Sequence, residues 1–254
     1  LLDKCLASLY ATEGGPDAAV EVFVVDNGSR DGSAAMVRAR YPQARVLEMH
    51  DNVGFARASN AGIVESTGRY VVLLNSDTVL HDGALQRLAA FLDEHSEFAA
   101  AGPLLLNPDG SVQESCFSFT TVRDILFEQA GLTALFPRSG VFNRRGLGDF
   151  DRTTARAVDW VSGACLMVRR SALDRVGLLD HAFFMYGEEL DWCYRMRKAG
   201  MRVAFYPGAR VTHVGRASSM HAPGELAPRA VAGRLRYFRK HHGVGAAFMV
   251  RALM

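Results

Sequence analysis

The first half of the chain alternates short apolar runs with stretches in which apolar residues recur at helical spacing. Runs of strand length and helical patterns follow one another at residues 20–26, 32–41, 44–49, 55–66, 69–75 and 83–95. Strands that alternate with helices predict an α/β fold, in which a mostly parallel sheet is covered by helices on both faces. Ligands of such sheets bind beyond the carboxyl ends of the strands, so the residues that directly follow each strand are candidates for a binding site.

The second half of the chain is less regular. A hairpin is predicted around residues 107–110, where "NPDG" favours a turn. The elements expected after it are a helix at 121–136, a Gly- and Arg-rich loop at 137–151, a strand followed by a helix from Arg170 to Val176, a helix that begins in an acidic stretch and reaches about Ala199, and strands at 201–207 and 209–219.

We interpret residues 1–225 as a single domain. Its nucleotide-binding half covers about 1–106 and its acceptor or catalytic half about 107–225, and a basic amphipathic tail follows at 226–254. The tail contains no Asp or Glu and alternates basic with apolar residues, as a helix at the surface of an anionic membrane would. The alternative is a solvated basic face that packs on the core through Leu235 and Phe238.

Composition narrows the class of protein. The chain has 254 residues, of which 49% are hydrophobic and 22% charged, which suits a soluble globular protein. A formal net charge of +2 lacks the strongly basic field of a general nucleic-acid binder. The four cysteines are widely spaced, which indicates neither a zinc ribbon nor a disulfide framework, and no apolar run approaches the roughly 18 to 20 residues that cross a bilayer. We therefore expect a cytoplasmic protein, held by its tail at most on the inner face of the membrane.

Polar residues follow three of the predicted strands: "DNGSRDGS" at 26–33, "HDNVGFARASN" at 50–60 and "NSDTVLHDG" at 75–83. Each stretch taken alone is explained by turn chemistry and helix capping. Turn chemistry does not explain why all three would fall at the same end of one sheet. Their joint placement predicts a shared binding site.

A second candidate site is "FFMYGEELDWCYR" at 183–195, in which three carboxylates follow an apolar segment. Acidic residues in a first helical turn also act as caps, and Asp191 with Arg195 has the spacing of an i, i+4 ion pair. The functional interpretation is that Glu189, supported by Glu188, removes a proton from a hydroxyl nucleophile. Apolar neighbours would raise the basicity of this carboxylate, and the helix N-terminus would oppose that rise.

The chain resembles glycosyltransferase family 2, and within it the rhamnosyltransferase-like bacterial members, over nearly its whole length to about residue 219. The resemblance is carried by six segments in order: "VVDNGSRDGS" (24–33), "NVGFARASNAGI" (52–63), "VVLLNSD" (71–77), "SGACLMVRRSALDRVGLLD" (162–180), "FFMYGEELDWCYRMRKAG" (183–200) and "VTHVGRAS" (211–218). It implies a GT-A fold, a nucleotide-diphospho-sugar donor such as dTDP-rhamnose or a UDP-sugar, Mn²⁺ or Mg²⁺, and inversion at the anomeric carbon. The implied acceptor is a hydroxyl of a cell-surface glycan or a lipid-linked acceptor.

The resemblance also assigns residues. Glu189 matches the catalytic base, and Asp77 with His213 matches the metal ligands. Asp26 matches the residue that accepts a hydrogen bond from the base of the donor. The other residues implied to contact the donor are Asn27, Gly54, Arg57, Asn60 and Asn75.

Two departures from the family leave other functions open. The family pair is usually Glu-Asp, whereas this chain has Glu188 and Glu189, and the first strand of the family is apparently missing from this chain. One alternative is a nucleotidyltransferase, which also binds nucleotides at the end of a parallel sheet. The other is a catalytically inactive protein that binds nucleotide sugars or serves as a scaffold.

Overall fold

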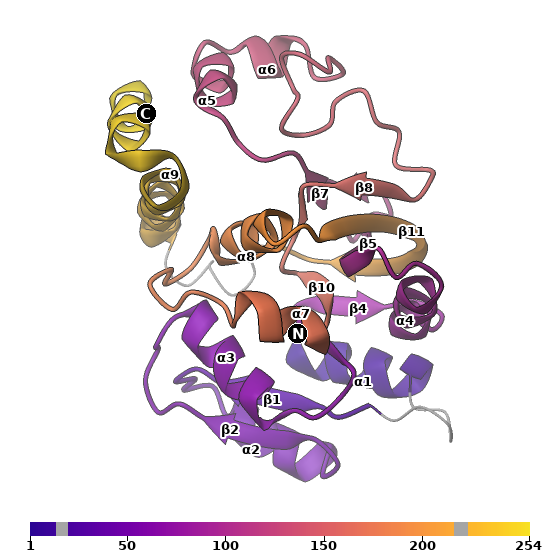
Figure 1. Cartoon of the computed structure of the whole chain (residues 1–254). Coiled ribbons are helices and arrows are strands. Elements are labelled where there is room, and N and C mark those ends of the chain that lie inside the picture. The colour runs from indigo at the N-terminus through magenta and orange to yellow at the C-terminus, as the bar shows by residue number, and fades with distance from the viewer. Residues whose placement is uncertain (14–19, 216–222) are drawn as a thin grey trace.

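The computed structural model describes residues 1–13, 20–215 and 223–254, and Figure 1 shows the arrangement of its elements. The first half follows the predicted alternation, with bounds within three residues of those expected. Its elements are α1 (Leu2–Glu13), β1 (Phe23–Asp26), α2 (Ser33–Arg40), β2 (Arg45–Glu48), α3 (Phe55–Glu65), β3 (Tyr70–Leu74), β4 (Thr78–Leu80), α4 (Ala84–Glu94) and β5 (Phe98–Leu106).

The second half contains shorter strands and the helices that flank them. Its elements are β6 (Val112–Gln113), β7 (Cys116–Phe117), α5 (Val122–Gln129), α6 (Leu132–Leu135), β8 (Arg156–Val158), β9 (Trp160–Val161), β10 (Cys165–Arg169), α7 (Arg170–Val176), α8 (Glu188–Lys198), β11 (Arg202–His213) and α9 (Pro223–Leu253). In Figure 1, β1, β2, α2 and α3 gather at one end of the molecule and α5 and α6 at the other, with α8 between them.

The central sheet has seven strands, with β3, β10, β5, β11 and β4 in that order and β6 and β8 at its margins. The α/β class is confirmed, but the sheet is mixed where a mostly parallel one was expected. β5 and β11 are parallel, whereas β10 runs antiparallel to both β3 and β5. The strands β3 and β5 have the same direction because α4 follows β3 and returns the chain before β5 begins. The chain reaches β10 through the β5–β6 hairpin and a long loop, and β10 lies between β3 and β5 in the sheet with the opposite direction.

The strands β1 and β2 form their own parallel sheet, in which Phe23 pairs with Arg45 and Asp26 with Glu48. Among the described residues no strand joins this pair to the seven-stranded sheet. The missing first strand remains a prediction.

Three elements predicted in the second half differ in outcome. The hairpin at 107–110 is confirmed, since the amide of Asn107 donates to the carbonyl of Ser111 at 2.8 Å. The expected helix at 121–136 is two helices, because Gly131 takes a left-handed conformation (φ 73°) between α5 and α6. The strands expected at 201–207 and 209–219 are one strand, β11, with an irregularity between Tyr206 and Arg210; residues 216–219 lie outside the described part.

The tail forms α9, which bends at Gly243 (φ 86°) into two helical segments. Tyr237, Phe238 and Val250 are fully buried, so one face of the tail packs on the core, as the second reading of the sequence expected. No helix in the described ranges is long and apolar enough to cross a membrane.

Candidate functional site

Two of the residues expected to hold a metal meet at one edge of the central sheet. Asp77 lies between β3 and β4, and His213 ends β11, where it pairs with Thr78 in the antiparallel register. The Nε2 atom of His213 is 3.3 Å from the Asp77 carboxylate, and the Asp77 carbonyl accepts a hydrogen bond from the amide of Val214. Asp77 is 5% exposed, so strand pairing fixes both ends of this contact in a sheltered place.

A third residue, Gln113, orients the imidazole of His213. Its side-chain nitrogen donates to the Asn107 side chain at 2.8 Å and to the His213 carbonyl at 3.1 Å. The remaining amide oxygen therefore accepts the Nδ1 proton of His213, at 2.7 Å. That proton position leaves a lone pair on Nε2, which faces Asp77.

The chemistry of these side chains fits a hard divalent cation. A buried carboxylate oxygen and an imidazole lone pair lie together, and an oriented second partner holds the imidazole, as is common around metal-binding histidines. The Asn75 side-chain nitrogen also lies 3.3 Å from Nε2. Within the described ranges no group of three His, Cys, Asp or Glu residues converges, so substrate oxygens and water would have to supply the other ligands.

The loops after β1 and β2 are bonded to each other. The Asn27 side chain donates to the Asn52 side chain at 3.0 Å and accepts from the amide of Val53 at 2.8 Å. Gly28 packs so closely that an added Cβ would lie 2.9 Å from the Asp51 carbonyl carbon. Two polar stretches that are 25 residues apart in sequence thus form one surface.

The second of these loops also contacts the acidic segment. The amide of Phe55 donates to the Phe184 carbonyl at 2.7 Å. Gly54 has φ 87°, and a Cβ there would lie 2.6 Å from the same carbonyl oxygen. Only glycine suits that position, and its close packing brings the nucleotide-side loops against the segment that leads to Glu188.

The other residues expected to contact the donor have different environments. Asp26 accepts from the amide of Ser29 at 3.2 Å, and Arg57 is exposed. Asn60 donates to the Leu179 carbonyl at 2.8 Å and accepts from the Leu179 amide at 3.1 Å. Its amide therefore ties α3 to the turn before the acidic segment, and its contact with the donor stays a prediction.

Glu188 and Glu189 begin α8 in an apolar setting. Glu188 is 5% exposed, and one carboxyl oxygen of each residue is buried without a hydrogen-bond partner. Burial, together with the charge of Glu189, raises the pKa of Glu188 well above its usual value. Burial also raises the pKa of Glu189, against which the backbone amides at Gly187, Gly163 and Leu190 act.

One loop connects these carboxylates to the Asp77 edge. Gly163 packs on Glu189, since an added Cβ would lie 3.7 Å from the Glu189 Cβ. The next residue, Ala164, accepts a hydrogen bond from the amide of Asn75 at 2.9 Å. Glu189 and Asn75, which lies two residues before Asp77, therefore contact neighbouring residues of one loop.

Asp191 lies in the same first turn of α8 but has a different environment. It is fully buried, and its carboxylate is 2.8 Å from Arg195 and 2.7 Å from both Lys240 and His241. These partners outweigh burial and lower the pKa of Asp191 to about 2. The predicted Asp191–Arg195 pair is confirmed; the contribution of α9 had no signal in the sequence, because 49 residues separate Asp191 from Lys240.

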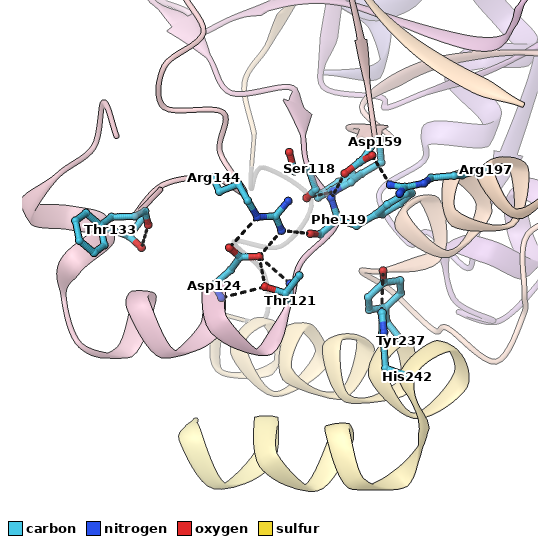
Figure 2. A network of polar contacts seen from close by, with 12 residues as sticks. Ser118, Phe119, Thr121, Asp124, Thr133, Arg144, Asp159, Arg197, Tyr237 and His242 are labelled. Carbon is cyan, nitrogen blue, oxygen red and sulfur yellow. Dashed lines mark hydrogen bonds and ion pairs between the residues drawn. The ribbon is translucent and has the colours of Figure 1, made fainter. Parts of the chain in front are cut away.

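Two cavities, of about 390 and 380 Å³, lie at the other end of α8. Asp159 and Arg197 line both of them and form an ion pair at 2.8 Å. Figure 2 shows this wall, where Arg144 also binds the Asp124 carboxylate and the Phe119 carbonyl. None of the residues expected to bind the donor lines either cavity.

Comparison with known proteins places these features in a family. A family model described as "Glycosyltransferase like family 2" matches residues 1–233. The chain is 33% identical over 227 residues to the N-acetylglucosaminyl-diphospho-decaprenol L-rhamnosyltransferase of Mycobacterium tuberculosis, a match that covers 84% of this chain and 71% of the relative. It is 26% identical to a low-salt glycan biosynthesis hexosyltransferase of Haloferax volcanii, over 79% of this chain and 60% of the relative.

Solved structures with little sequence identity share the fold. A mannosyltransferase from Pyrobaculum calidifontis, in complex with GDP-Man and Mn²⁺, superposes with a TM-score of 0.61 at 19% identity, over 94% of this chain and 59% of its own. GalNAc-T7 with UDP, GalNAc and Mn²⁺ also gives a TM-score of 0.61, at 14% identity, over 84% of this chain and 40% of its own. The expected GT-A architecture is therefore confirmed.

Proposed function

Because the chain belongs to glycosyltransferase family 2, we propose that it transfers a sugar from a nucleotide-diphospho-sugar to a hydroxyl of a glycan or lipid-linked acceptor, with inversion at the anomeric carbon. One observation carries the proposal: Glu189 packs on Gly163, and Asn75, two residues before Asp77, donates a hydrogen bond to the next residue, Ala164. A base for the acceptor and a cradle for the leaving diphosphate thus flank one place.

In this reaction the acceptor oxygen bonds to the anomeric carbon as the bond from that carbon to the phosphate oxygen breaks. The hydroxyl proton passes to Glu189, and the nucleoside diphosphate leaves with the electron pair. Burial raises the pKa of both carboxyl groups, and the charge of Glu189 adds to the rise at Glu188. A carboxylate whose pKa is raised in this way is a stronger base than one in water.

Asp77 and His213 would hold the divalent ion, with Gln113 orienting the imidazole. A bound cation supplies charge that stabilises the departing diphosphate oxygens. A nitrogen ligand favours Mn²⁺ over Mg²⁺. The loops around Asn27 and Gly54 would receive the nucleotide, and Asp26 would accept a hydrogen bond from its base.

The name of the mycobacterial relative directs the choice of substrates. A rhamnosyl donor such as dTDP-rhamnose is the first candidate, UDP-sugars are the next, and a polyprenyl-diphosphate sugar is the acceptor class to test. The mannosyl and N-acetylgalactosaminyl ligands of the solved structures lie on chains under 20% identical, so they do not decide the donor.

A donor screen tests the proposal. The protein is mixed with Mn²⁺ and each of dTDP-rhamnose, UDP-glucose, UDP-N-acetylglucosamine and GDP-mannose, and the released products are separated. Free nucleoside diphosphate with a glycosylated acceptor is expected. Release of pyrophosphate would instead indicate a nucleotidyltransferase, and calorimetric binding of a donor without turnover would indicate an inactive scaffold.

The metal assignment has its own test. We expect Asp77→Asn to abolish Mn²⁺ binding, and Gln113→Leu to weaken it about 10- to 100-fold because the imidazole loses its orientation. Isothermal calorimetry with Mn²⁺ alone measures both. Asp109→Asn, at the exposed hairpin turn, is the matched control and should bind as the native chain does.

The last segment of α9 offers a surface for an anionic membrane. Val244 is 72% exposed, Phe248 71% and Met249 51%, and Arg251 is exposed beside them. No Asp or Glu follows Glu225 in the chain, so no acidic residue neighbours this apolar patch in sequence. We infer that it rests on the cytoplasmic face of the membrane that carries the acceptor. Flotation with vesicles of phosphatidylglycerol at low salt should recover the native chain, and Phe248→Ser should lower that recovery; equal recovery with neutral vesicles would contradict the role of charge.

A further inference from the structure

The turn directly before Glu188 has an unusual backbone. Tyr186 has φ 70° and Gly187 has φ 97°, so two consecutive residues adopt left-handed conformations. For a residue with a large side chain this conformation is strained and persists only where neighbouring structure holds it. The direction in which α8 begins, and with it the direction of Glu188 and Glu189, depends on this turn.

The first segment of α9 packs directly on the turn at Gly233. An added Cβ at Gly233 would overlap the Tyr186 carbonyl oxygen, and an added Cβ at Gly187 would lie 3.4 Å from the Gly233 carbonyl. Gly233 is buried within the helix, where glycine is less favourable than alanine. The close approach of the two backbones explains why glycine is there.

Two turns further along, α9 contacts α8 a second time. Lys240 and His241 both contact the Asp191 carboxylate at 2.7 Å, and the His241 ring lies 4.3 Å from the ring of Tyr194. Figure 2 shows Tyr237 and His242 of α9 next to α8, and Tyr237 packs edge-on against Tyr194 at 5.5 Å. The helix α9 thus holds α8 on both sides of the position of Glu188 and Glu189: at the turn before them and at Asp191 after them.

We propose that the first segment of α9, residues 227–242, is a positioning element for the acidic pair. Gly233 seats the Tyr186–Gly187 turn, and Lys240 with His241 anchors Asp191, so that the Glu188 and Glu189 carboxylates keep one direction. The inference rests on the proposed function, because it assigns a part of the chain outside the substrate site to the orientation of the base. None of these α9 residues needs to touch either substrate.

The first test compares two identical substitutions in one helix. Gly233→Ala should push the turn aside and lower kcat at least tenfold while leaving the KM for the donor within about twofold, since a displacement of about 1 Å can cost two orders of magnitude. Gly245→Ala is the matched control, because an added Cβ there meets nothing within 4 Å. Equal kcat values for Gly233→Ala and Gly245→Ala would overturn the proposal.

A second pair of variants covers the case in which Gly233→Ala does not fold. Lys240→Met removes one partner of Asp191 and should lower kcat several-fold at unchanged donor KM. Arg239→Met, at the neighbouring exposed position, should behave as the native chain does. A Lys240→Met variant that kept the native kcat would count against the anchor.

Hydrogen exchange of the amides at 186–190 provides a readout that needs no turnover. Exchange should be faster in Gly233→Ala and Lys240→Met than in the native chain and both controls. If no donor is turned over by the native chain, the proposed function fails, and exchange still decides whether α9 holds the turn. Unchanged exchange in both variants would refute the inference by itself.

Discussion

Within the first turn of α8 the same chemical group has two opposite environments. Glu188 and Glu189 each have one buried carboxyl oxygen without a hydrogen-bond partner, and burial raises the pKa of each. Asp191 is fully buried, contacts Arg195, Lys240 and His241, and has a pKa lowered to about 2. Burial is common to both, so the partners alone decide the sign of the shift.

The difference separates a reactive carboxylate from a structural one. A carboxylate surrounded by Arg195, Lys240 and His241 is held as an anion and is a poor proton acceptor. A buried carboxylate without partners is costly to ionise and therefore keeps a high affinity for a proton. The partners of Asp191 stabilise the folded protein, whereas the buried acidic pair destabilises it, as is common for residues of a reactive site.

The largest expected effect is on catalysis. Glu189→Gln removes the base and keeps the shape of the side chain, so kcat should fall about 10²- to 10⁴-fold while the free energy of unfolding does not decrease. Steady-state kinetics and urea unfolding measure the two quantities. The exposed Glu94→Gln at the end of α4 serves as control. If Glu189→Gln lost stability without loss of kcat, Glu189 would be a structural carboxylate and not the reactive one.

Asp191→Asn should show the opposite pattern, a large loss of stability. Removing the anion leaves the charges of Arg195 and Lys240 without this counter-charge, and breaking such a buried ion pair costs about 3 kcal/mol. Urea unfolding at neutral pH measures the change. Asp174→Asn, at an exposed position of α7, should change the free energy of unfolding little. If Asp191→Asn were as stable as that control, the three contacts would contribute nothing.

Asp191 and Glu188 also predict opposite pH dependences of the free energy of unfolding. The contribution of Asp191 is complete above its unfolded pKa near 3.8 and is lost as the pH falls toward 2. The pKa of Glu188 is raised above 4.5, so the stability it contributes is complete below that value and is lost as the pH rises through the raised pKa. Unfolding free energies from about pH 3 to 8 should show a weaker acid loss in Asp191→Asn and a weaker loss at higher pH in Glu188→Gln. Parallel curves for both variants and the native chain would contradict this division.

The smallest expected effect concerns the planar guanidinium of Arg195. Its guanidinium binds Asp191 and donates to the carbonyls of Val176 and Leu178, which lysine cannot do at once. Arg195→Lys keeps the charge and loses these hydrogen bonds, so the free energy of unfolding should fall by about 1–2 kcal/mol. Thermal unfolding measures it, and a change as large as that of Asp191→Asn would show that geometry outweighs charge.

Local patterns allowed much of this structure to be predicted. The six elements expected between residues 20 and 95 lie within three residues of their expected bounds, since apolar periodicity is a local signal, whereas the short strand β4 was not expected. The Asp77–His213 contact followed from motif resemblance and is present. The direction of β10 did not follow, because strand direction depends on the long path between β5 and β10 and no local residue pattern records it.

The site residues that the sequence did not reveal act over long separations. Gln113 is a single amide two residues beyond a turn, and its partner His213 is 100 residues away. Gly233 is one glycine in a helical pattern, where a tolerated interruption looks the same as a packing requirement. The bonds between Asn60 and Leu179 likewise join residues 119 positions apart, which no local pattern records.

The position of β11 has a consequence for how the protein is made. This strand lies between β5 and β4, so a strand emerging late from the ribosome fills the interior of a sheet whose neighbours were synthesised about a hundred residues earlier. Until it docks, β4 and β5 have exposed edges, and such edges invite pairing with other chains. Nascent chains stalled before residue 202 should therefore depend on chaperones more than chains released after His213.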